Sequence, residues 1–444
     1  MPDSLIKETM KSLRRLAVAT MIFLLALGCG SWVTAEEPET VLWVVTERTQ
    51  EMEMNRIVQE VIEEFSWKHP NVSFNLEILP VGDRDRARRT EKLQELMERG
   101  EGPDIFLLPT KSFASQGMRN KGIEPLITSV PYAMRQGDFL DISQYYDKDE
   151  ALGKDGLQRI VMDAGCVEGK RFLLPICFNL NSSFFLSSDV NSELQADMTV
   201  SEVMDYVIRS DDPLLAKILT ANSAAMYRPE MVFSSLIDYD TGKVTLSFNE
   251  AEEFFDRFQK LREMANEDDV EGYVSGSSTI WGYVKTPASK RTLYPCYLEG
   301  LPHVMSLHGI SELEDKELTA IPLRAADGTV TAMINYYGAI GADCKSPRTA
   351  YEFLRMFLLP EYQWQIGETD NPLLDGWPVR VKGSVEAMWE QICNNIDSQK
   401  VRSQLENLGA SDAWITDITD QITRAEFRVE IYLANSLEQM SVSK

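Results

Sequence analysis

The chain has 444 residues, a formal charge of −25 at pH 7 and 44% hydrophobic residues. Such an acidic surface repels phosphate backbones and anionic lipid, which excludes nucleic acid and the membrane surface as binding partners. The length exceeds one ordinary hydrophobic core and predicts two domains or lobes.

An export signal opens the chain. A basic segment ending at Arg15 precedes an apolar run from Leu16 to Leu27, which is shorter than a membrane span. The small residues Val33-Thr34-Ala35 provide a cleavage site, so we expect residues 1–35 to be a signal peptide. The mature protein would then begin at Glu36, outside the cytoplasm, secreted or at the cell surface.

A second interpretation of the signal involves lipid attachment. Ala26-Leu27-Gly28-Cys29 resembles a degenerate lipobox, in which Cys29 would be lipidated and retained. The six cysteines of the chain are widely spaced with no Cys-x-x-Cys, so a metal knuckle or redox motif is not expected. Whether the protein is free or lipid-anchored, and whether it holds a disulfide, stays open at this point.

The segment after the signal shows alternating strand and helix patterns. The expected elements are a strand at Val41 to Val45, a helix at Met54 to Phe65, a strand at Val72 to Ile78, a helix around Leu93 to Met97 closed by Gly100, and a strand at Ile105 to Leu108. Short connections between them predict an α/β fold with a parallel sheet and right-handed crossovers. Arg84 to Arg89 is an isolated basic run, which we expect to be a solvated loop.

Later segments add a hairpin and a helix. Asp240-Thr241-Gly242-Lys243 lies between two short apolar runs and predicts a hairpin turn. An apolar helical pattern starts at Ala251. Further helical spacing after Val401 predicts C-terminal helices.

Several of these segments resemble motifs of one protein family. The motifs are Trp43 in the first strand, Glu63-Glu64-Phe65 leading to His69-Pro70, Gly100-Glu101-Gly102-Pro103-Asp104-Ile105, the Glu168-Gly169-Lys170 hairpin leading to Pro175, and the helix of Pro347 to Leu359. In this order they are similar to the extracellular solute-binding proteins of ATP-driven (ABC) importers, in the carbohydrate-binding branch that includes maltose-binding protein. The matches are scattered between Val41 and Trp377.

The resemblance implies a two-lobed, periplasmic-binding-protein-like α/β fold with a ligand cleft at the hinge. The expected parts are residues 36–182 and 338–380 in the first lobe, and residues 183–337 and the C-terminal helices of residues 381–444 in the second. Open α/β sheets bind ligands outside the carboxyl ends of their strands, which places the site between the lobes. The chain would cross there near Asn179 to Phe185, near Asn335 to Ala339 and near Trp377 to Ser384.

Aromatic and amide side chains near these crossings suit a sugar, whose apolar face stacks on a ring and whose hydroxyls need donors and acceptors. The candidate ligand-binding residues are Trp43, Thr46, Glu47, Thr110, Lys111, Asn179, Asn181, Trp281, Tyr294, Tyr336, Tyr337 and Trp377. The expected partners are a small solute, an oligosaccharide by preference, and the subunits of a membrane ABC permease, with the protein a monomer.

Two other functions stay open. The protein could instead be a ligand-sensing subunit that reports to a membrane kinase, or a secreted carbohydrate-active enzyme, since its many carboxylates do not exclude a glycosidase pair. The three histidines lack metalloprotease spacing, and no Walker loop, dinucleotide fingerprint or Gly-x-Ser-x-Gly elbow occurs. We therefore expect a non-enzymatic protein without cofactor or metal.

Overall fold

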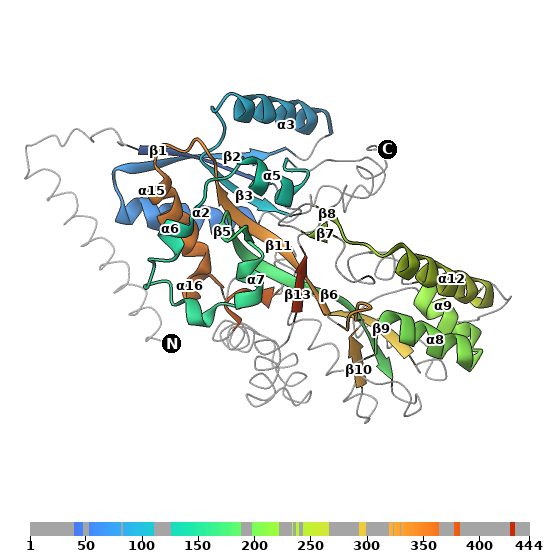
Figure 1. Ribbon diagram of the computed structural model, residues 1–444. Helices are drawn as coiled ribbons and strands as arrows, with labels where there is room; N and C mark the ends of the chain where they lie inside the picture. The colour runs from blue at the N-terminus through green and yellow to red at the C-terminus, as the bar shows by residue number, and fades with distance from the viewer. Residues whose placement is uncertain are drawn as a thin grey trace, which may run out of the picture.

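The computed structural model shows a mixed α/β protein with two hydrophobic cores (Figure 1). It describes residues 40–47, 53–80, 83–110, 126–187, 198–221, 233, 237–238, 243–265, 293–298, 319–322, 324–328, 330–363, 377–381 and 427–430. The larger core defines the first lobe, the smaller core the second, and long strands connect them. Within the described residues, no helix combines the length and apolar character needed to cross a membrane.

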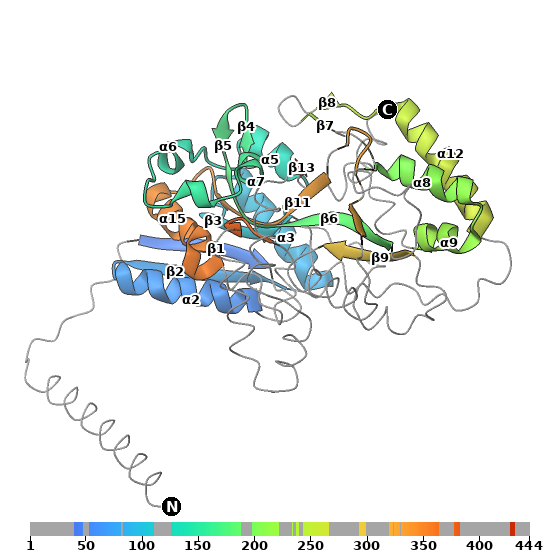
Figure 2. The ribbon, with the colours of Figure 1, turned by 90° about the horizontal axis from the view of Figure 1, so that it is seen from below.

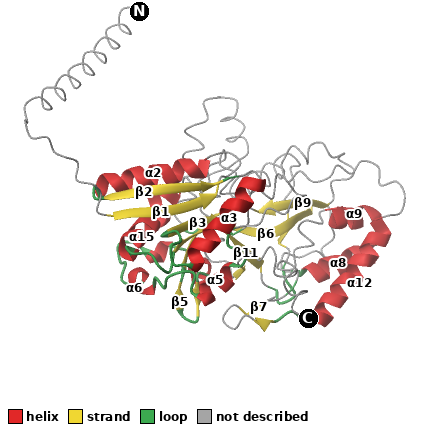
Figure 3. Cartoon of the chain, turned by 90° about the horizontal axis from the view of Figure 1, so that it is seen from above, coloured by secondary structure: helices red, strands yellow, loops and turns green. Residues whose placement is uncertain are grey.

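The first lobe begins with the predicted alternation of strands and helices. The elements are β1 (Thr40–Glu47), α2 (Glu53–Lys68), β2 (Val72–Leu79), α3 (Asp83–Glu98) and β3 (Ile105–Pro109). β1 lies between β2 and β3 and pairs with both in parallel, as the sequence predicts. α2 and α3 cover opposite faces of this sheet (Figure 3), which explains why β3 is buried along its whole length.

A region of short elements follows in the same lobe. It contains α5 (Val130–Gln136), α6 (Ser143–Tyr146), η1 (Lys154–Gly156), α7 (Arg159–Asp163), β4 (Cys166–Val167) and β5 (Lys170–Arg171). Strands β4 and β5 form the predicted hairpin. Glu168 and Gly169 in its turn have φ angles of 51° and 75°, as expected of a two-residue hairpin turn that needs positive φ at both positions.

Two long strands are shared by both lobes. β6 (Leu173–Ser187) lies between β11 (Val330–Ile340) and β12 (Trp377–Pro378) at its first half. At its second half it lies between β9 (Leu293–Leu298) and β10 (Thr319–Pro322). Figure 2 shows β6 passing from one lobe to the other. β6 therefore changes its neighbours partway along its length.

β11 changes neighbours in the same way. It pairs with β3 from Tyr336 to Ile340 and with β13 (Phe427–Glu430) from Val330 to Met333. The described strands of the main sheet thus follow the order β10-β6-β11-β3-β1-β2. β13 falls in the C-terminal segment that we expected to be helical, because its apolar spacing was compatible with a helix. The strand instead supplies hydrogen-bond partners to the edge of β11 that β3 leaves open.

The second lobe has a small helical core. It is built from α8 (Val200–Ser210), α9 (Pro213–Ala221) and α12 (Phe248–Ala265). The predicted hairpin forms β7 (Ile237–Asp238) and β8 (Lys243–Val244). Thr199 begins α8 with a capping box, in which the Thr199 hydroxyl accepts from the Glu202 amide and the Glu202 carboxylate accepts from the Thr199 amide. Such a cap satisfies amides that a helix start otherwise leaves unpaired.

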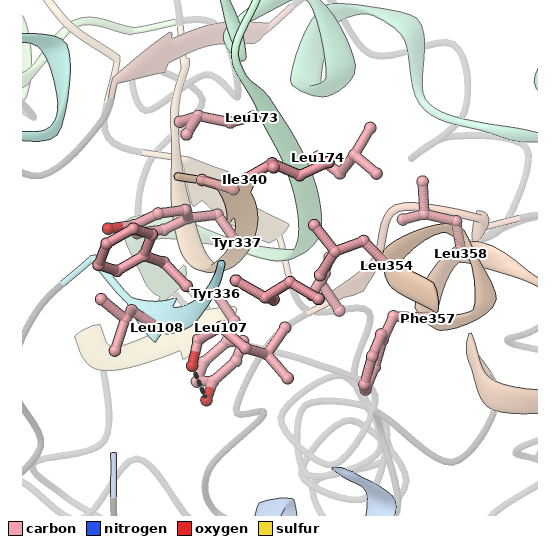
Figure 4. Packing of buried hydrophobic residues seen from close by; sticks show 14 of the residues in the cluster. Leu107, Leu108, Leu173, Leu174, Tyr336, Tyr337, Ile340, Leu354, Phe357 and Leu358 are labelled. Carbon is pink, nitrogen blue, oxygen red and sulfur yellow. Dashed lines mark hydrogen bonds between the residues drawn. The ribbon is translucent and has the colours of Figure 1, made fainter. Parts of the chain in front are cut away.

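The chain then returns to the first lobe. It forms α15 (Pro347–Leu354) and η3 (Arg355–Leu358) in the region predicted as one helix, followed by α16 (Pro360–Gln363). Leu354, Phe357 and Leu358 pack with side chains of β3, β6 and β11 in the first core (Figure 4). A Cβ atom at Gly338 would lie 2.8 Å from Leu354 Cδ2, so a larger residue there would force the Leu354 side chain to move.

One expectation for the first lobe was wrong. Arg84 to Arg89 is not a solvated loop but part of α3, and the Arg86 side chain is buried. Its counter-ion Glu47 lies at the end of β1, which makes burial of the guanidinium feasible. The signal segment with Cys29, as well as Lys111 and Trp281, lies outside the described residues.

Candidate functional site

The carboxyl ends of β1 and β3 lie side by side. Thr46 of β1 is in register with Leu107 of β3, and Glu47 and Thr110 follow at the ends of the two strands. β11 borders β3 here, with Tyr336 opposite Pro109. Open α/β sheets bind ligands at such strand ends, and this one adjoins the segment of β11 that connects the lobes.

The Tyr336 hydroxyl joins the two strand ends. It donates a hydrogen bond to the Leu107 carbonyl oxygen at 2.8 Å and lies 2.7 Å from the Thr46 hydroxyl. A phenol has one proton, so Thr46 must donate to Tyr336. The ring is fully buried, and this burial raises the pKa of Tyr336 well above its ordinary value, with the Thr46 bond opposing the change. The hydroxyl is neutral at any physiological pH.

Thr110 ties the end of β3 to β11. Its amide donates to the Asn335 carbonyl oxygen at 3.0 Å, and its hydroxyl donates to the Ile334 carbonyl oxygen. The pairing of β11 with β6 is irregular at this point, with register shifts between Ile334 and Tyr336 and between Tyr336 and Tyr337. Bulges of this kind redirect backbone groups, and here the carbonyls of the irregular segment accept bonds from Thr110.

A buried ion pair lies beside the strand ends. Arg86 of α3 donates to the Glu47 carboxylate at 2.5 Å, and both side chains are almost fully buried. Removing one member of such a pair leaves an uncompensated buried charge. The pair fixes the start of α3 against the end of β1.

Trp43 lies farther back along β1. Its indole nitrogen donates to Glu77 at 3.1 Å, Glu77 forms an ion pair with Arg89, and the Arg89 guanidinium lies 6.0 Å from the indole ring. The Trp43 amide donates to Asp104 at 2.9 Å. The aspartate of the Pro103-Asp104 motif thus has a structural partner in β1.

Two other candidates carry buried polar atoms that have no partner among the described residues. Tyr337 and Trp377 are fully buried in the first core. Within the described part of the chain, the Tyr337 hydroxyl and the Trp377 indole nitrogen accept or donate no hydrogen bond. Burial raises the pKa of Tyr337 above its ordinary value, and the nearby Glu47 raises it further. Figure 4 shows the Tyr336 and Tyr337 rings leaving β11 in different directions.

The remaining candidates are placed only by their backbone. Asn179 pairs with Met333 in the β6–β11 ladder, and Asn181 lies where the β6–β9 register shifts. Tyr294 pairs with Leu186 in the second-lobe half of β6. These positions put the two asparagines at the change of strand partners and Tyr294 beyond it.

The structure therefore brings together Thr46, Glu47, Thr110 and Tyr336, with Tyr337 adjacent, but places Trp43 and Trp377 apart from this cluster. The sequence did not predict a role for Arg86, which pairs with Glu47. Nor did it predict the backbone carbonyls that accept bonds from Tyr336 and Thr110, namely those of Leu107, Ile334 and Asn335. One signal was available for Arg86. It occupies the buried stripe of α3 four residues before Thr90 and seven before Leu93, where a lone charge indicates a buried partner.

Hollows formed by described residues lie away from this cluster. One of about 710 Å³ lies between the end of β2 and α3, lined largely by charged side chains that include Glu77, Arg89 and Lys92. Another, of about 70 Å³, lies by Asp138 and Gly341 at the opposite end of the sheet. Within the described ranges, no group of three His, Cys, Asp or Glu side chains is arranged to hold a metal ion.

Comparison with known proteins gives likenesses to solved structures. No protein-family model and no curated protein matches the chain. It is similar to CpMnBP1 with mannotriose bound, at 12% identity over 91% of this chain and 93% of that chain, with a TM-score of 0.47. It is also similar to an extracellular solute-binding protein family 1 member from Alicyclobacillus acidocaldarius, at 11% identity over 92% of this chain and 97% of that chain, with a TM-score of 0.44. A designed esterase is similar at 14% identity over 84% of this chain and 85% of that chain, with a TM-score of 0.45.

Several other similar structures are described as solute-binding or substrate-binding proteins. The likenesses concern the course of the chain, and at TM-scores under 0.5 they carry no argument about its function.

Proposed function

We propose that the protein is an extracytoplasmic solute-binding protein that captures a carbohydrate or related polar solute between its lobes and delivers it to a membrane ABC permease. Binding would select a closed arrangement of the lobes, and the permease would recognise that arrangement. The protein would bind and release the solute without changing it chemically.

One observation carries this proposal. Both strands that connect the two cores change their partners beside the carboxyl ends of β1 and β3. A few residues at such an element boundary are the usual place for hinge rotation. A solute held at the strand ends would therefore lie where the two lobes move relative to one another. The order of the sequence motifs supports the same function.

The candidate residues divide into floor and wall of the proposed site. Thr46, Glu47 and Thr110 would form the floor at the strand ends. Asn179 and Asn181 would supply amides from the connecting strand, and Lys111, Trp281 and Tyr294 would supply charge and ring faces. Amides match sugar hydroxyls because each offers both donors and acceptors.

The first experiment is thermal unfolding of the protein begun at Glu36, in the presence of mono- and oligosaccharides, sugar acids and peptides. A ligand at 100 times its dissociation constant stabilises a protein by about 2.7 kcal/mol, which corresponds to a shift of several degrees. A saturable shift with one class of solute and no product formed would support the proposal. A shift accompanied by release of reducing ends would favour the secreted enzyme instead.

Matched amide variants test the site. Asn179→Ala with Asn181→Ala should weaken binding of the identified solute at least tenfold. Asn75→Ala changes the same chemical group on the exposed side of β2 and should leave affinity unchanged. If the double variant binds the solute as tightly as Asn75→Ala does, the two asparagines of the connecting strand are not part of the site.

A further inference from the structure

We propose that Tyr336 is a positioning residue, which sets the geometry of the solute site through Thr46 and Leu107 without touching the solute. This inference rests on the proposed function and gives Tyr336 a different role from the direct contact expected from the sequence. Its hydroxyl comes from a strand shared by both lobes and reaches both strand ends of the first lobe.

The bonding capacity of the hydroxyl is taken up within the protein. Its single proton goes to the Leu107 carbonyl oxygen, and it accepts the proton of Thr46. The whole side chain is inaccessible to solvent. A sugar hydroxyl could bond to it only by displacing one of these partners, so the group is suited to holding strands rather than holding solute.

The same short segment of β11 makes the other links to β3. Ile334 and Asn335 accept the two bonds from Thr110, and Tyr336 follows directly. This segment is also the irregular part of the β11–β6 ladder. A displacement of β11 on lobe movement would therefore reach Thr46 and Thr110 together, and the strand ends would respond as one unit.

A double-mutant cycle on affinity tests this role, with mannotriose as the probe. Tyr336→Phe and Thr46→Val each remove one hydroxyl from the pair. If Tyr336 acts through Thr46, each variant should bind about tenfold more weakly, and the double variant should bind no more weakly than the worse single variant. Additive losses in the cycle would overturn the inference, because they would show an independent contact with the solute.

Tyr351→Phe is the matched control. Tyr351 is a buried tyrosine of the same core, and its hydroxyl donates to Asp149 at 3.0 Å, away from the strand ends. The variant loses one hydroxyl bond of a buried tyrosine, whereas Tyr336→Phe loses two, and it should keep the affinity of the unmodified protein within twofold. If both variants weaken binding equally, Tyr336 contributes only general stability and the inference fails.

A second measurement does not require solute. Amide hydrogen exchange of the free protein should show faster exchange at Thr110, whose amide bonds to Asn335, in Tyr336→Phe but not in Tyr351→Phe. The Leu140 amide, which bonds to Ile340 at the other end of β11, should be unaffected in both. Unchanged exchange at Thr110 would overturn the inference. If the unmodified protein does not bind mannotriose, that solute is excluded, while the exchange result still decides the role of Tyr336.

Discussion

The two cores of the molecule are held together differently. The first contains buried polar side chains among its apolar ones, namely Thr46, Glu47, Arg86, Thr90, Thr110, Gln158, Arg171, Gln363 and Arg380. The described second core consists of apolar side chains from three helices and Phe233. Hydrogen bonds are directional, whereas apolar packing is not. In the first lobe, buried polar groups therefore fix the positions of particular atoms, whereas the described second core depends on apolar packing alone. Fixed positions are what the proposed site at the strand ends of the first lobe requires.

Arg380 shows how the first core uses polar groups. Its guanidinium donates to the carbonyl oxygens of Leu358, Gly153 and Leu152 at 2.9, 3.1 and 2.5 Å. Its amide donates to the buried Gln363 side chain at 2.9 Å. Burial lowers the pKa of Arg380, while the charge of Glu361 opposes that change. One side chain thus connects three segments that would otherwise leave carbonyls unpaired.

The largest effect should come from Arg380→Met, which keeps a long side chain but removes every donor. We expect a loss of about 4 kcal/mol in the free energy of unfolding, because the buried carbonyls of Leu152 and Leu358 and the partly buried carbonyl of Gly153 lose their partner. Chemical denaturation measures it. Gly156→Ala should weaken the same network, since a Cβ there would lie 2.3 Å from the Arg380 Nη1 atom. A loss below about 1 kcal/mol in Arg380→Met would show that directional bonds do not distinguish the first core.

Leu261→Ala should have the next largest effect. Leu261 is fully buried in the second core, and truncating a buried leucine costs about 3 kcal/mol through lost burial and a cavity. Hydrogen exchange should show the loss in α8 and α12, with α2 unaffected. Leu261→Met, which keeps the volume, should cost about 1 kcal/mol. Equal loss of protection in α2 would mean that the shared strands make both cores one cooperative unit.

Thr199→Ala should cost about 1 kcal/mol, because it removes the side-chain cap of α8. The cap also has a pH dependence. Bonds from Thr199 hold the pKa of Glu202 below its ordinary value of 4.5, so the stabilisation is present above pH 4.5 and is lost as the pH falls through the lowered value. Denaturation at pH 3 and 7 should show a smaller acid-induced loss in Glu202→Gln. If Glu202→Gln loses as much unfolding free energy on acidification as the unmodified protein, the cap does not contribute to acid sensitivity.

The smallest effect on stability should come from Tyr337→Phe. Its hydroxyl is buried without a partner in the described residues, so its removal leaves nothing unpaired and should change the free energy of unfolding by less than about 0.5 kcal/mol. Tyr336→Phe, one residue away, should cost about 1 kcal/mol. Weaker solute binding by Tyr337→Phe at unchanged stability would indicate that the hydroxyl gains a partner in the bound state. If Tyr337→Phe loses as much stability as Tyr336→Phe, the predicted difference between the two tyrosines is wrong.

Local patterns predicted much of the fold. The continuous apolar run at Val41 to Val45 and the alternation at Val72 to Ile78 correspond to β1 and β2, because burial on two faces and on one face leave different sequence periods. The resemblance of Glu168-Gly169-Lys170 to a family motif predicted the β4–β5 hairpin, whose turn has positive φ angles at Glu168 and Gly169. β13 was not predicted, since a short apolar segment fits both helix and strand.

The site was less predictable because its contacts are distant in sequence. Thr46 and Tyr336 are hydrogen-bonded although 290 residues separate them. The position of Tyr336 also depends on register shifts in the β11–β6 ladder, which no residue pattern predicts. Aromatic residues near the crossings were read as ring faces for a sugar, yet Tyr336, Tyr337 and Trp377 are fully buried in this structure. Residue type does not distinguish an aromatic side chain in a core from one that lines a cleft.

The strand order of the sheet also affects how the chain assembles during synthesis. β3 is made early, but its neighbour β11 is made only after residue 330. Until then one edge of β3, a strand with five buried residues, has no partner to pair with. Exposed apolar edges recruit other chains, and folds with such distant pairings form slowly. During synthesis, this edge of β3 therefore stays unpaired until β11 has emerged.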